Sequence, residues 1–243
     1  MQAIILAGGK GVRLKPFTTC IPKPLLPIDD TPILEIILKQ LKNFGFTNFV
    51  LSLNYLADLL IAFFNTGEKY GIDIEYSIEE SALGTAGPIS IIDNLEDTFL
   101  VMNGDLLTSI DYNDLYNFHL KNENDVTISV FNKEVKIDLG VIQSENEKFL
   151  NYIEKPIYNF DVSMGIYVFN KNVVEFIPKN LKMDIPDLIT LLSQNGKKIG
   201  CYRGDYDWLD IGRFDDYDKA TSIFREKRGV FLPNEKNIMS RIK

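Results

Sequence analysis

The chain of 243 residues is poor in the side chains on which most acid–base and zinc chemistry depends. It contains one histidine, two cysteines and one tryptophan. Two cysteines provide no disulfide framework, and one histidine leaves too few ligands for a zinc site. A lone histidine without a visible partner also makes poor proton-transfer machinery, so we interpret His119 as a solvated residue of a polar helix. Chemistry in this chain should therefore depend on carboxylates, cations and a bound metal ion.

Long apolar runs are missing as well. No stretch approaches the ~20 residues that a membrane-spanning helix needs, and the chain starts in a strand-like run without a basic leader. The formal net charge is −8 and no basic patch stands out, which argues against nucleic acid as a partner. These features favour a cytoplasmic protein that binds neither a membrane nor a nucleic acid. A homo-oligomer is one arrangement that the sequence leaves open.

Apolar strand-like runs alternate with helix-like runs through the first half of the chain. We expect strands at 2–6, 48–53, 72–78 and 99–102, and helices at 32–44, 55–65, 85–93 and 112–121. This order predicts an α/β fold with a Rossmann-like, mostly parallel sheet flanked by helices.

The pattern changes from residue 125 onward. Short strand-like runs with short connections follow at 126–131, 140–143, 149–153 and 164–169, and they predict a smaller, more antiparallel subregion. Helices are expected at 172–177, 186–195 and 213–228, a strand at 199–202, and a polar tail from about residue 229. Because no linker or repeat separates the halves, we predict a single two-lobed domain over 1–243. Its first part covers about 1–122 and its second part about 123–228.

The most informative segment is the loop at 6–27, which reads LAGGKGVRLKPFTTCIPKPLLP and follows the first strand. Three nearby glycines let backbone N–H groups approach a bulky anion, because no Cβ stands in the way. Arg13 and Lys23 add two positive charges to the same loop. This combination predicts a site for the phosphates of a nucleoside triphosphate.

Two common phosphate-binding motifs do not fit this loop. A Walker loop needs Gly-Lys-Ser/Thr at the start of a helix, whereas here the Lys-Gly order is reversed and Pro16 follows. A dinucleotide-binding fingerprint needs a third glycine where Leu14 stands. The loop is therefore a phosphate site of another type, and a dehydrogenase is the weakest alternative.

Two aspartates are candidate metal ligands. Asp105 ends the run Asn-Gly-Asp directly after the strand at 99–102, and Asp210 follows another short apolar element. Ligands of open α/β sheets bind beyond the carboxyl ends of the strands, where two carboxylates could hold Mg²⁺ on a triphosphate. An ordinary turn aspartate explains Asp105 equally well, and several neighbours of Asp210 are solvated in either case.

Two further segments carry candidate contacts to substrates. Glu79 and Glu80 precede a glycine-flanked helix start, and a carboxylate there accepts both donors on the Watson–Crick edge of guanine, whereas the carbonyls of uracil would repel it. Lys155, after Glu154 and before a proline, could bind a phosphate while the carboxylate accepts sugar hydroxyls. Solvated surface pairs are the alternative reading at both places.

These motifs occur in the order found in sugar-1-phosphate nucleotidyltransferases, and the chain resembles that family over about residues 1–225. The motifs are GGxGxRL and PKP in the first loop, LGTAG at 83–87, NGD at 103–105, EKP at 154–156, GIYVF at 165–169 and WxDIG at 208–212. Residues 69–88 look closest to the mannose-1-phosphate guanylyltransferase branch, since thymidylyltransferases typically carry glutamine where Glu79 stands.

The resemblance implies a GT-A-like fold and a reaction in which a sugar 1-phosphate attacks the α-phosphorus of a nucleoside triphosphate, most favourably GTP, with Mg²⁺ as cofactor. It implies catalytic roles for Arg13, Lys23 and Asp105, with Asp105 and Asp210 on the metal. Nucleotide contacts are implied for Leu6, Ala7, Gly8, Gly9, Lys10, Gly11, Glu79, Gly84 and Thr85. Sugar-phosphate contacts are implied for Gly104, Gly140, Glu154, Lys155, Ser163 and Gly165.

The chain departs from the family pattern at Ser163, Met164 and Arg213, and it has no room for the β-helix domain of the longer guanylyltransferases. Mannose, heptose and amino-sugar 1-phosphates therefore stay open as acceptors. The same reaction with dTTP, UTP or CTP stays open too. A non-catalytic, nucleotide-sensing regulatory homologue is a further alternative, although the retention of the catalytic candidates argues against it.

Overall fold

The structure is a computed structural model that describes residues 1–233. A seven-stranded sheet forms its centre, with the strand order β12-β8-β11-β6-β1-β4-β5. The strands are β1 (Gln2–Leu6), β4 (Asn48–Leu53), β5 (Asp73–Ile78), β6 (Thr98–Asn103), β8 (Val126–Lys136), β11 (Ile157–Asn170) and β12 (Ile199–Arg203). β1 runs parallel to β4 and β6, and β4 runs parallel to β5, whereas β11 runs antiparallel to both β6 and β8. The prediction of an α/β fold with a mostly parallel sheet is confirmed.

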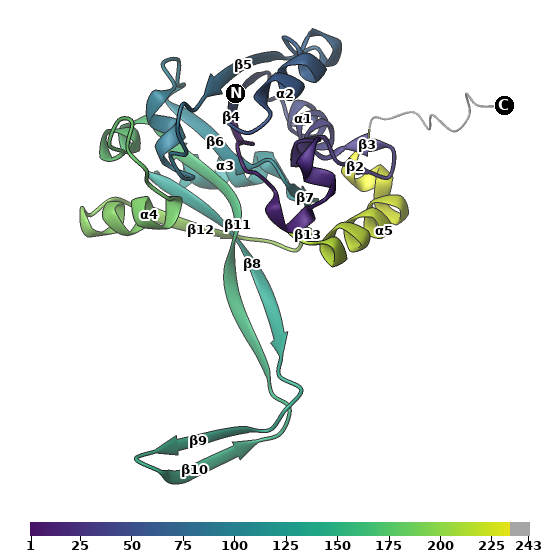
Figure 1. The fold of residues 1–243 in the computed structure, drawn as a ribbon. Coiled ribbons are helices and arrows are strands. Elements are labelled where there is room, and N and C mark those ends of the chain that lie inside the picture. The colour runs from purple at the N-terminus through teal and green to yellow at the C-terminus, as the bar shows by residue number, and fades with distance from the viewer. Residues whose placement is uncertain (234–243) are drawn as a thin grey trace, which may run out of the picture.

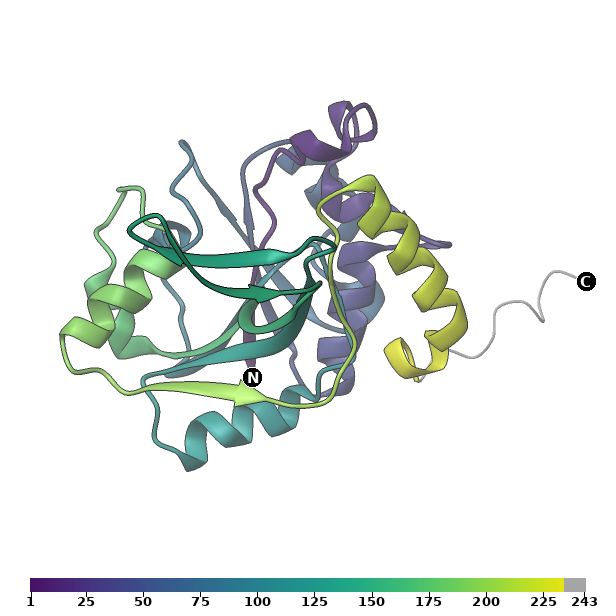
Figure 2. The same ribbon diagram turned by 90° about the horizontal axis from the view of Figure 1, so that it is seen from below.

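Helices cover both faces of this sheet (Figures 1 and 2). They are α1 (Ile33–Asn43), α2 (Ala57–Phe64), α3 (Tyr112–Lys121), α4 (Ile185–Gln194) and α5 (Phe214–Phe231). Successive side chains of a strand point to opposite faces of the sheet. The side chains of β1 therefore belong to two different hydrophobic cores. Ala3 and Ile5 pack with α1, α2, α3 and α5, whereas Ile4 packs with α4. Figure 2 shows α4 and α5 on opposite sides of the body.

Three short elements complete the body near the carboxyl ends of β1 and β6. The loop after β1 contains the 3₁₀ turns Val12–Leu14, Phe17–Thr19 and Lys23–Leu25, and ends in the small hairpin of β2 (Pro27–Ile28) and β3 (Thr31–Pro32). β7 (Leu106–Thr108) pairs antiparallel with β13 (Trp208–Asp210). The polar loop, β7 and β13 therefore meet at one edge of the sheet.

Two predicted helices are only 3₁₀ segments, at Gly87–Ile91 and Lys171–Phe176. The predicted polar tail also begins too early, because α5 continues to Phe231. The Phe231 ring is fully buried and packs at 5.9 Å from that of Phe224, so burial of an apolar side chain extends the helix. Residues 234–243 of the predicted tail lie outside the described residues. Among residues 1–233, none of the helices is long and apolar enough for crossing a bilayer.

His119 is also not solvated, contrary to the interpretation from sequence. Its side chain is fully buried, with Nδ1 at 2.9 Å from the Thr127 hydroxyl and Nε2 at 3.0 Å from Asn170 Oδ1. Burial lowers the pKa of His119 below its ordinary value. The residue therefore belongs to a structural polar network beneath α3.

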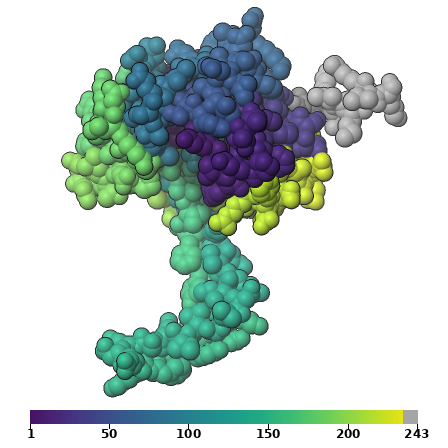
Figure 3. Space-filling view, in the orientation of Figure 1, coloured from purple at the N-terminus to yellow at the C-terminus, as the bar shows by residue number. Residues whose placement is uncertain are grey.

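The predicted antiparallel subregion is divided between the central sheet and an arm. Its runs at 126–131 and 164–169 belong to β8 and β11 of the sheet, and its other two runs lie in the arm, which we define as residues 132–161. The outer parts of β8 and β11 continue beyond the sheet as a two-stranded ribbon, with pairs from Asn132↔Asp161 out to Lys136↔Ile157. A hairpin of β9 (Val141–Glu145) and β10 (Lys148–Ile153) lies at the end of the ribbon. Figures 1 and 3 show the arm projecting clear of the body.

Candidate functional site

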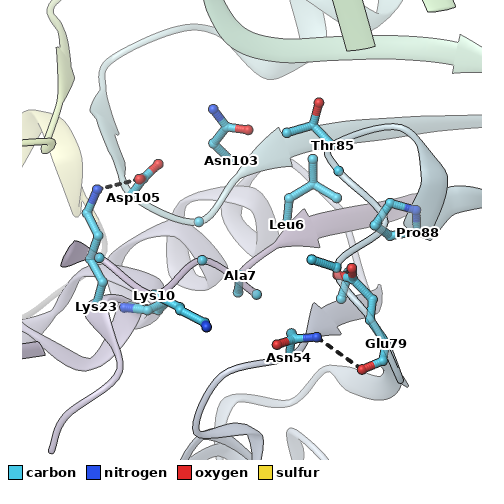
Figure 4. A pocket seen from close by; sticks show the side chains of 18 of the residues that line it. Leu6, Ala7, Lys10, Lys23, Asn54, Glu79, Thr85, Pro88, Asn103 and Asp105 are labelled. Carbon is cyan, nitrogen blue, oxygen red and sulfur yellow. Dashed lines mark hydrogen bonds and ion pairs between the residues drawn. The ribbon is translucent and has the colours of Figure 1, made fainter. Parts of the chain in front are cut away.

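A cavity of ≈ 590 Å³ lies beyond the carboxyl ends of β1 and β6. This size lies within the usual range of small-molecule sites. Figure 4 shows the cavity with β1 at its centre and with the loop after β5 on one side. Its lining residues are Leu6–Arg13, Lys23, Pro24, Ser52, Asn54, Glu79, Ala82, Gly84, Thr85, Pro88, Asn103–Asp105, Lys182 and Asp184.

The glycine loop forms one wall of the cavity, as the sequence predicts. Gly11 has φ +58°, and its carbonyl accepts a 2.8 Å hydrogen bond from the Thr18 hydroxyl. A Cβ on Gly8 would lie 3.1 Å from Glu79 Oε1, whereas a Cβ on Gly9 would meet nothing within 4 Å. The loop therefore presents bare backbone to the cavity, which is the property that binding of a phosphate requires.

Lys23 and Asp105 meet at the edge of the cavity. Lys23 sits on the last 3₁₀ turn of the loop and is 8% exposed, and its ammonium group donates to Asp105 Oδ2 (Figure 4). Asp105 stands in the turn between β6 and β7, directly after the strand that places it. The two residues lie 82 positions apart in sequence, and the fold joins them into one charged centre.

Asp210 joins this centre through the pairing of β13 with β7. Asp210 lies opposite Leu106, and the backbone N–H of Ile211 donates to the carbonyl of Asp105 at 3.1 Å. Burial of its carboxyl group, and then the nearby carboxylate of Asp105, raise the pKa of Asp210. Arg13 lies close by, since a Cβ on Gly212 would approach its guanidinium group to 3.2 Å. All four charged residues predicted to act on the phosphates therefore converge.

The donor set of this centre suits a hard cation. Mg²⁺ in nucleotide sites uses one or two carboxylates and completes its shell with phosphate oxygens and water. Asp105 and Asp210 supply two such carboxylates, and the pairing of β13 with β7 brings them together. Within residues 1–233, no group of three or more His, Cys, Asp or Glu side chains could hold a metal ion by itself.

Glu79 lies in the cavity at the other end from the charged centre, and it is buried. Its Oε2 accepts a 2.8 Å hydrogen bond from the backbone N–H of Leu83, and its Oε1 lies 3.3 Å from the Ser52 hydroxyl. Its carbonyl accepts from the Asn54 side chain at 3.1 Å (Figure 4). Glu80 is exposed and does not line the cavity. Of the two acidic candidates, the fold therefore selects Glu79.

The segment at Gly84 and Thr85 is fixed by a distant part of the chain. Gly84 has φ +81°, and a Cβ there would lie 2.5 Å from the carbonyl oxygen of Met183. The N–H of Thr85 donates to Asp184 Oδ1 at 3.0 Å, and the N–H of Ile185 donates to the Thr85 hydroxyl at 2.8 Å. Glycine at position 84 is required both by its backbone angle and by this close approach.

Five of the predicted contacts to the sugar phosphate do not line the cavity. Gly140, Glu154 and Lys155 belong to the arm, and both charged side chains are exposed. From Ser163 to Ile157 the ribbon advances by roughly 20 Å at ~3.3 Å per residue, which carries Lys155 well away from the cavity of its own chain.

Ser163 and Gly165 lie at the base of the arm, beside the cavity. A Cβ on Gly165, which has φ +72°, would approach the side chain of Asn103 to 2.5 Å. The hydroxyl groups of Ser163 and Tyr167 form a 2.8 Å hydrogen bond. Of the predicted sugar-phosphate contacts, only Gly104 itself lines the cavity.

Several lining residues were missed at the level of sequence. Asn103 is the first residue of the NGD motif, and Ala82 and Pro88 flank the LGTAG motif, so the motifs could have predicted all three. Asp184 and Lys182 have no local signal, because they reach the cavity only through the packing of residues 181–185 against the segment at 83–87.

The chain is similar to known proteins over nearly its whole length. Residues 2–227 match the family model described as nucleotidyl transferase. The chain is 32% identical to UTP–glucose-1-phosphate uridylyltransferase of Synechocystis over 96% of its length, and 32% identical to mannose-1-phosphate guanylyltransferase of Mycobacterium tuberculosis over 91%. It spans 66% and 64% of those two relatives, which is slightly less than two thirds of their length.

Two solved structures cover nearly the whole chain. A putative glucose-1-phosphate thymidylyltransferase from Bacillus anthracis superposes with a TM-score of 0.75 over 93% of this chain and 96% of that one; at 23% identity it supports the fold alone. HddC from Yersinia pseudotuberculosis, solved in complex with GMP-PN, superposes with a TM-score of 0.70 at 27% identity, over 92% of this chain and 99% of that one.

Proposed function

The chain belongs to the nucleotidyl transferase family, and from this premise we propose that it transfers GMP from GTP to a sugar 1-phosphate. One observation carries the proposal: a single cavity gathers the bare glycine loop, the Lys23–Asp105 pair and the buried Glu79. These elements match the three parts of the substrate, namely its phosphates, its reacting phosphorus and its base.

In the proposed reaction, an oxygen of the sugar phosphate forms a bond to the α-phosphorus of the triphosphate. The bond from this phosphorus to the bridging oxygen of the β-phosphate breaks, and pyrophosphate leaves with that electron pair. Such transfers depend on alignment and charge stabilisation more than on proton transfer. A site without a histidine, but with the cations Arg13 and Lys23 beside its glycine loop, suits this requirement.

Within this proposal, Arg13 and the loop glycines hold the β- and γ-phosphates, and Lys23 lies against the α-phosphoryl group. Asp105 and Asp210 would hold Mg²⁺, which would supply further positive charge to the phosphate oxygens. When substrate binds, the ammonium group of Lys23 can move from the Asp105 carboxylate toward the phosphate. The ion pair therefore keeps a buried cation in place before the triphosphate arrives.

Glu79 favours guanine over the other bases. Guanine presents two adjacent donors, and the remaining lone pairs of a carboxylate that is already fixed by the Leu83 N–H can accept them. The guanylyltransferase relatives and the HddC complex with GMP-PN support this choice. UTP is the second candidate, because the uridylyltransferase of Synechocystis is as similar to this chain.

The acceptor is proposed at the level of class. The relatives named for mannose 1-phosphate favour a mannose-type sugar 1-phosphate, and heptose and amino-sugar 1-phosphates are the other candidates. Gly104 lines the cavity and remains a predicted contact to the acceptor phosphate. Lys155 and Glu154 remain predicted contacts, which the arm must bring to a cavity.

The proposal is tested by measuring pyrophosphate release with GTP, UTP, dTTP and CTP, each crossed with a panel of sugar 1-phosphates. We expect turnover with GTP and at least one manno-configured acceptor. Turnover with UTP alone would overturn the choice of base and leave the reaction class in place. Nucleotide binding without turnover for every pair would instead support a regulatory homologue.

A further inference from the structure

The arm presents an apolar face that the rest of its own chain leaves uncovered. In an antiparallel ribbon, residues that pair directly lie on the same face, and the faces alternate along each strand. The pairs Val135↔Tyr158 and Lys133↔Phe160 share one face, and the rings of Tyr158 and Phe160 lie 6.3 Å apart on it. The opposite face carries the polar pairs Glu134↔Asn159 and Asn132↔Asp161, with Lys136↔Ile157 at its outer end. The ribbon is therefore amphipathic, like a strand pair that packs on a core.

This apolar face is continuous with the core of the body. At the base of the arm, Phe131 pairs opposite Val162, and the ring of Phe131 packs 5.3 Å from that of Trp208. Farther out on the same face the apolar side chains are exposed to solvent, and Phe160 is 52% exposed. Figure 3 shows the arm projecting away from the body.

The arm as a whole exposes many large apolar side chains. Its exposed large apolar side chains are Val135, Leu139, Ile142, Phe149, Leu150, Tyr152, Ile157 and Phe160. An isolated two-stranded ribbon is marginally stable in water, and contiguous exposed apolar surface marks a contact site. The arm is therefore built to lie against another surface.

A matching surface lies beside the cavity. Four exposed apolar side chains of the body belong to the loop beside the cavity or contact it: Val12 lines the cavity, Phe17 and Ile21 lie farther along the same loop, and Phe214 lies at the start of α5. The rings of Phe17 and Phe214 are in contact at 5.6 Å. We call these four residues the rim patch.

The loop that carries most of the rim patch is opposite in charge to the outer hairpin of the arm. Lys23 is paired with Asp105, and the rest of this loop, residues 10–22, contains three basic residues and no carboxylate. The outer hairpin of the arm, residues 138–154, contains four carboxylates and one lysine. Electrostatic complementarity of this kind steers association and sets its register.

We propose that two copies of the chain exchange arms, so that the arm of each copy lies on the rim patch of the other and brings Lys155 to the other copy's cavity. Reciprocal exchange uses the same two surfaces on both chains, which closes a two-fold dimer. This inference rests on the proposed function in one respect, which is the chemical role of Lys155 in the other copy's cavity.

The arm cannot serve its own cavity in the conformation described here. The ribbon runs roughly 20 Å from Ser163 to Ile157, at ~3.3 Å per residue, and Lys155 lies beyond that end. The pairs of β8 with β11 from Ser163↔Val130 to Ile157↔Lys136 hold the ribbon in this extended direction. Exchange between copies keeps every one of these pairs.

Complementation between two inactive variants tests the exchange. Lys155→Ala and Asp105→Asn chains carry different affinity tags, are co-expressed, and are purified through both tags in turn. In the mixed dimer, one cavity combines an intact Asp105 with an intact Lys155 from the partner, so we expect about half of the wild-type turnover, since one site of two is complete. An arm that serves its own cavity leaves both sites defective, and turnover no higher than that of the single variants would overturn the proposal.

A second experiment needs no enzymatic activity, so that it separates the exchange from the proposed function. In a background with Cys20→Ser and Cys201→Ser, a Lys155→Cys chain is paired with a Val12→Cys chain through the same two tags. Mild oxidation should link the two chains covalently, whereas absence of the linked species would overturn the exchange. If the link forms and no transferase activity is found, the proposed function alone fails.

Sedimentation of point variants tests the docking face. The wild-type protein should sediment as two 27.7 kDa chains, and Phe160→Ser should shift it toward a single chain. Asn159→Ser, on the polar face of the same strand, is the matched control and should stay dimeric. A wild-type protein that sediments as one chain, or a Phe160→Ser variant that stays as dimeric as the control, would overturn the proposal.

Discussion

The choice of guanine depends on one carboxylate, and replacing Glu79 by glutamine tests it directly. The substitution keeps the shape of the side chain and removes its charge and one acceptor. The buried N–H of Leu83 needs an acceptor, so the remaining oxygen should stay at the 2.8 Å position that Oε2 occupies now. The amide NH₂ group then takes the place of Oε1, 3.3 Å from the Ser52 hydroxyl and facing the cavity.

The expected cost follows from this geometry. The NH₂ group would meet the N1–H and N2–H₂ donors of guanine with another donor, so at least one charge-assisted hydrogen bond is lost. Such a bond contributes about 1.5–3 kcal/mol. At about 1.4 kcal/mol per factor of ten, kcat/KM for GTP should fall roughly 10- to 150-fold. Uracil has carbonyl oxygens that an NH₂ group can serve, so kcat/KM for UTP should stay level or rise.

The assay compares kcat/KM for GTP and for UTP at a fixed, saturating acceptor concentration. Glu80→Gln is the matched control, because Glu80 is the adjacent residue, is exposed and does not line the cavity. An unchanged GTP-to-UTP ratio in Glu79→Gln, or an equal shift in Glu80→Gln, would refute the assignment of Glu79 to the base. A melting curve of each variant checks that the Leu83 hydrogen bond still holds the loop.

Three further substitutions test the charged centre and the buried network. Asp105→Asn should lower kcat at least ~100-fold through loss of a ligand at the reacting phosphate, and near-normal turnover would remove Asp105 from this role. Lys23→Ala should likewise lower kcat, whereas a change confined to the KM of the sugar phosphate would reassign Lys23 to the acceptor. His119→Gln should flatten the pH dependence of stability. Burial lowers the pKa of His119 in the folded chain, so the unfolded chain takes up the proton first, and the free energy of unfolding falls as pH drops below about 6.5. Melting temperatures that decline equally in wild type and variant toward about pH 5 would contradict this assignment.

Much of the sheet is predictable from local patterns, because buried parallel strands appear as short apolar runs between helical segments. The run from Gln2 to Leu6 and the helix after Pro32 follow that rule. The predicted helix at 85–93 does not, since Gly84 and Gly87 press against the backbone of residues 181–183 and leave only a 3₁₀ segment. That contact joins segments almost a hundred residues apart and has no signature in either of them.

The residues of the site likewise fall into those that a local motif predicts and those that it does not. Residues that directly follow a strand, such as Asp105 after β6, are placed by the end of that strand, and so a motif locates them. Asp210 reaches Asp105 because β13 pairs with β7, which the apolar run before Asp210 indicates only weakly. Asp184 holds Thr85 across 99 residues, and no property of its own neighbourhood marks it. His119 was misjudged for the same reason, because its partners Thr127 and Asn170 lie on other elements.

The arm shows most clearly what local sequence leaves undecided. Alternating residues and the turn between β9 and β10 specify that these strands pair and which side chains share a face. They do not specify where a two-stranded ribbon points, because its direction depends on the surface that covers its apolar face. Phe160 and Lys155 are separated by only five positions, so whatever surface covers the ring of Phe160 also determines which cavity Lys155 can reach. The same interface would then set both the oligomeric state and the completeness of the site, and dilution into monomers should lower turnover even when every catalytic residue is intact.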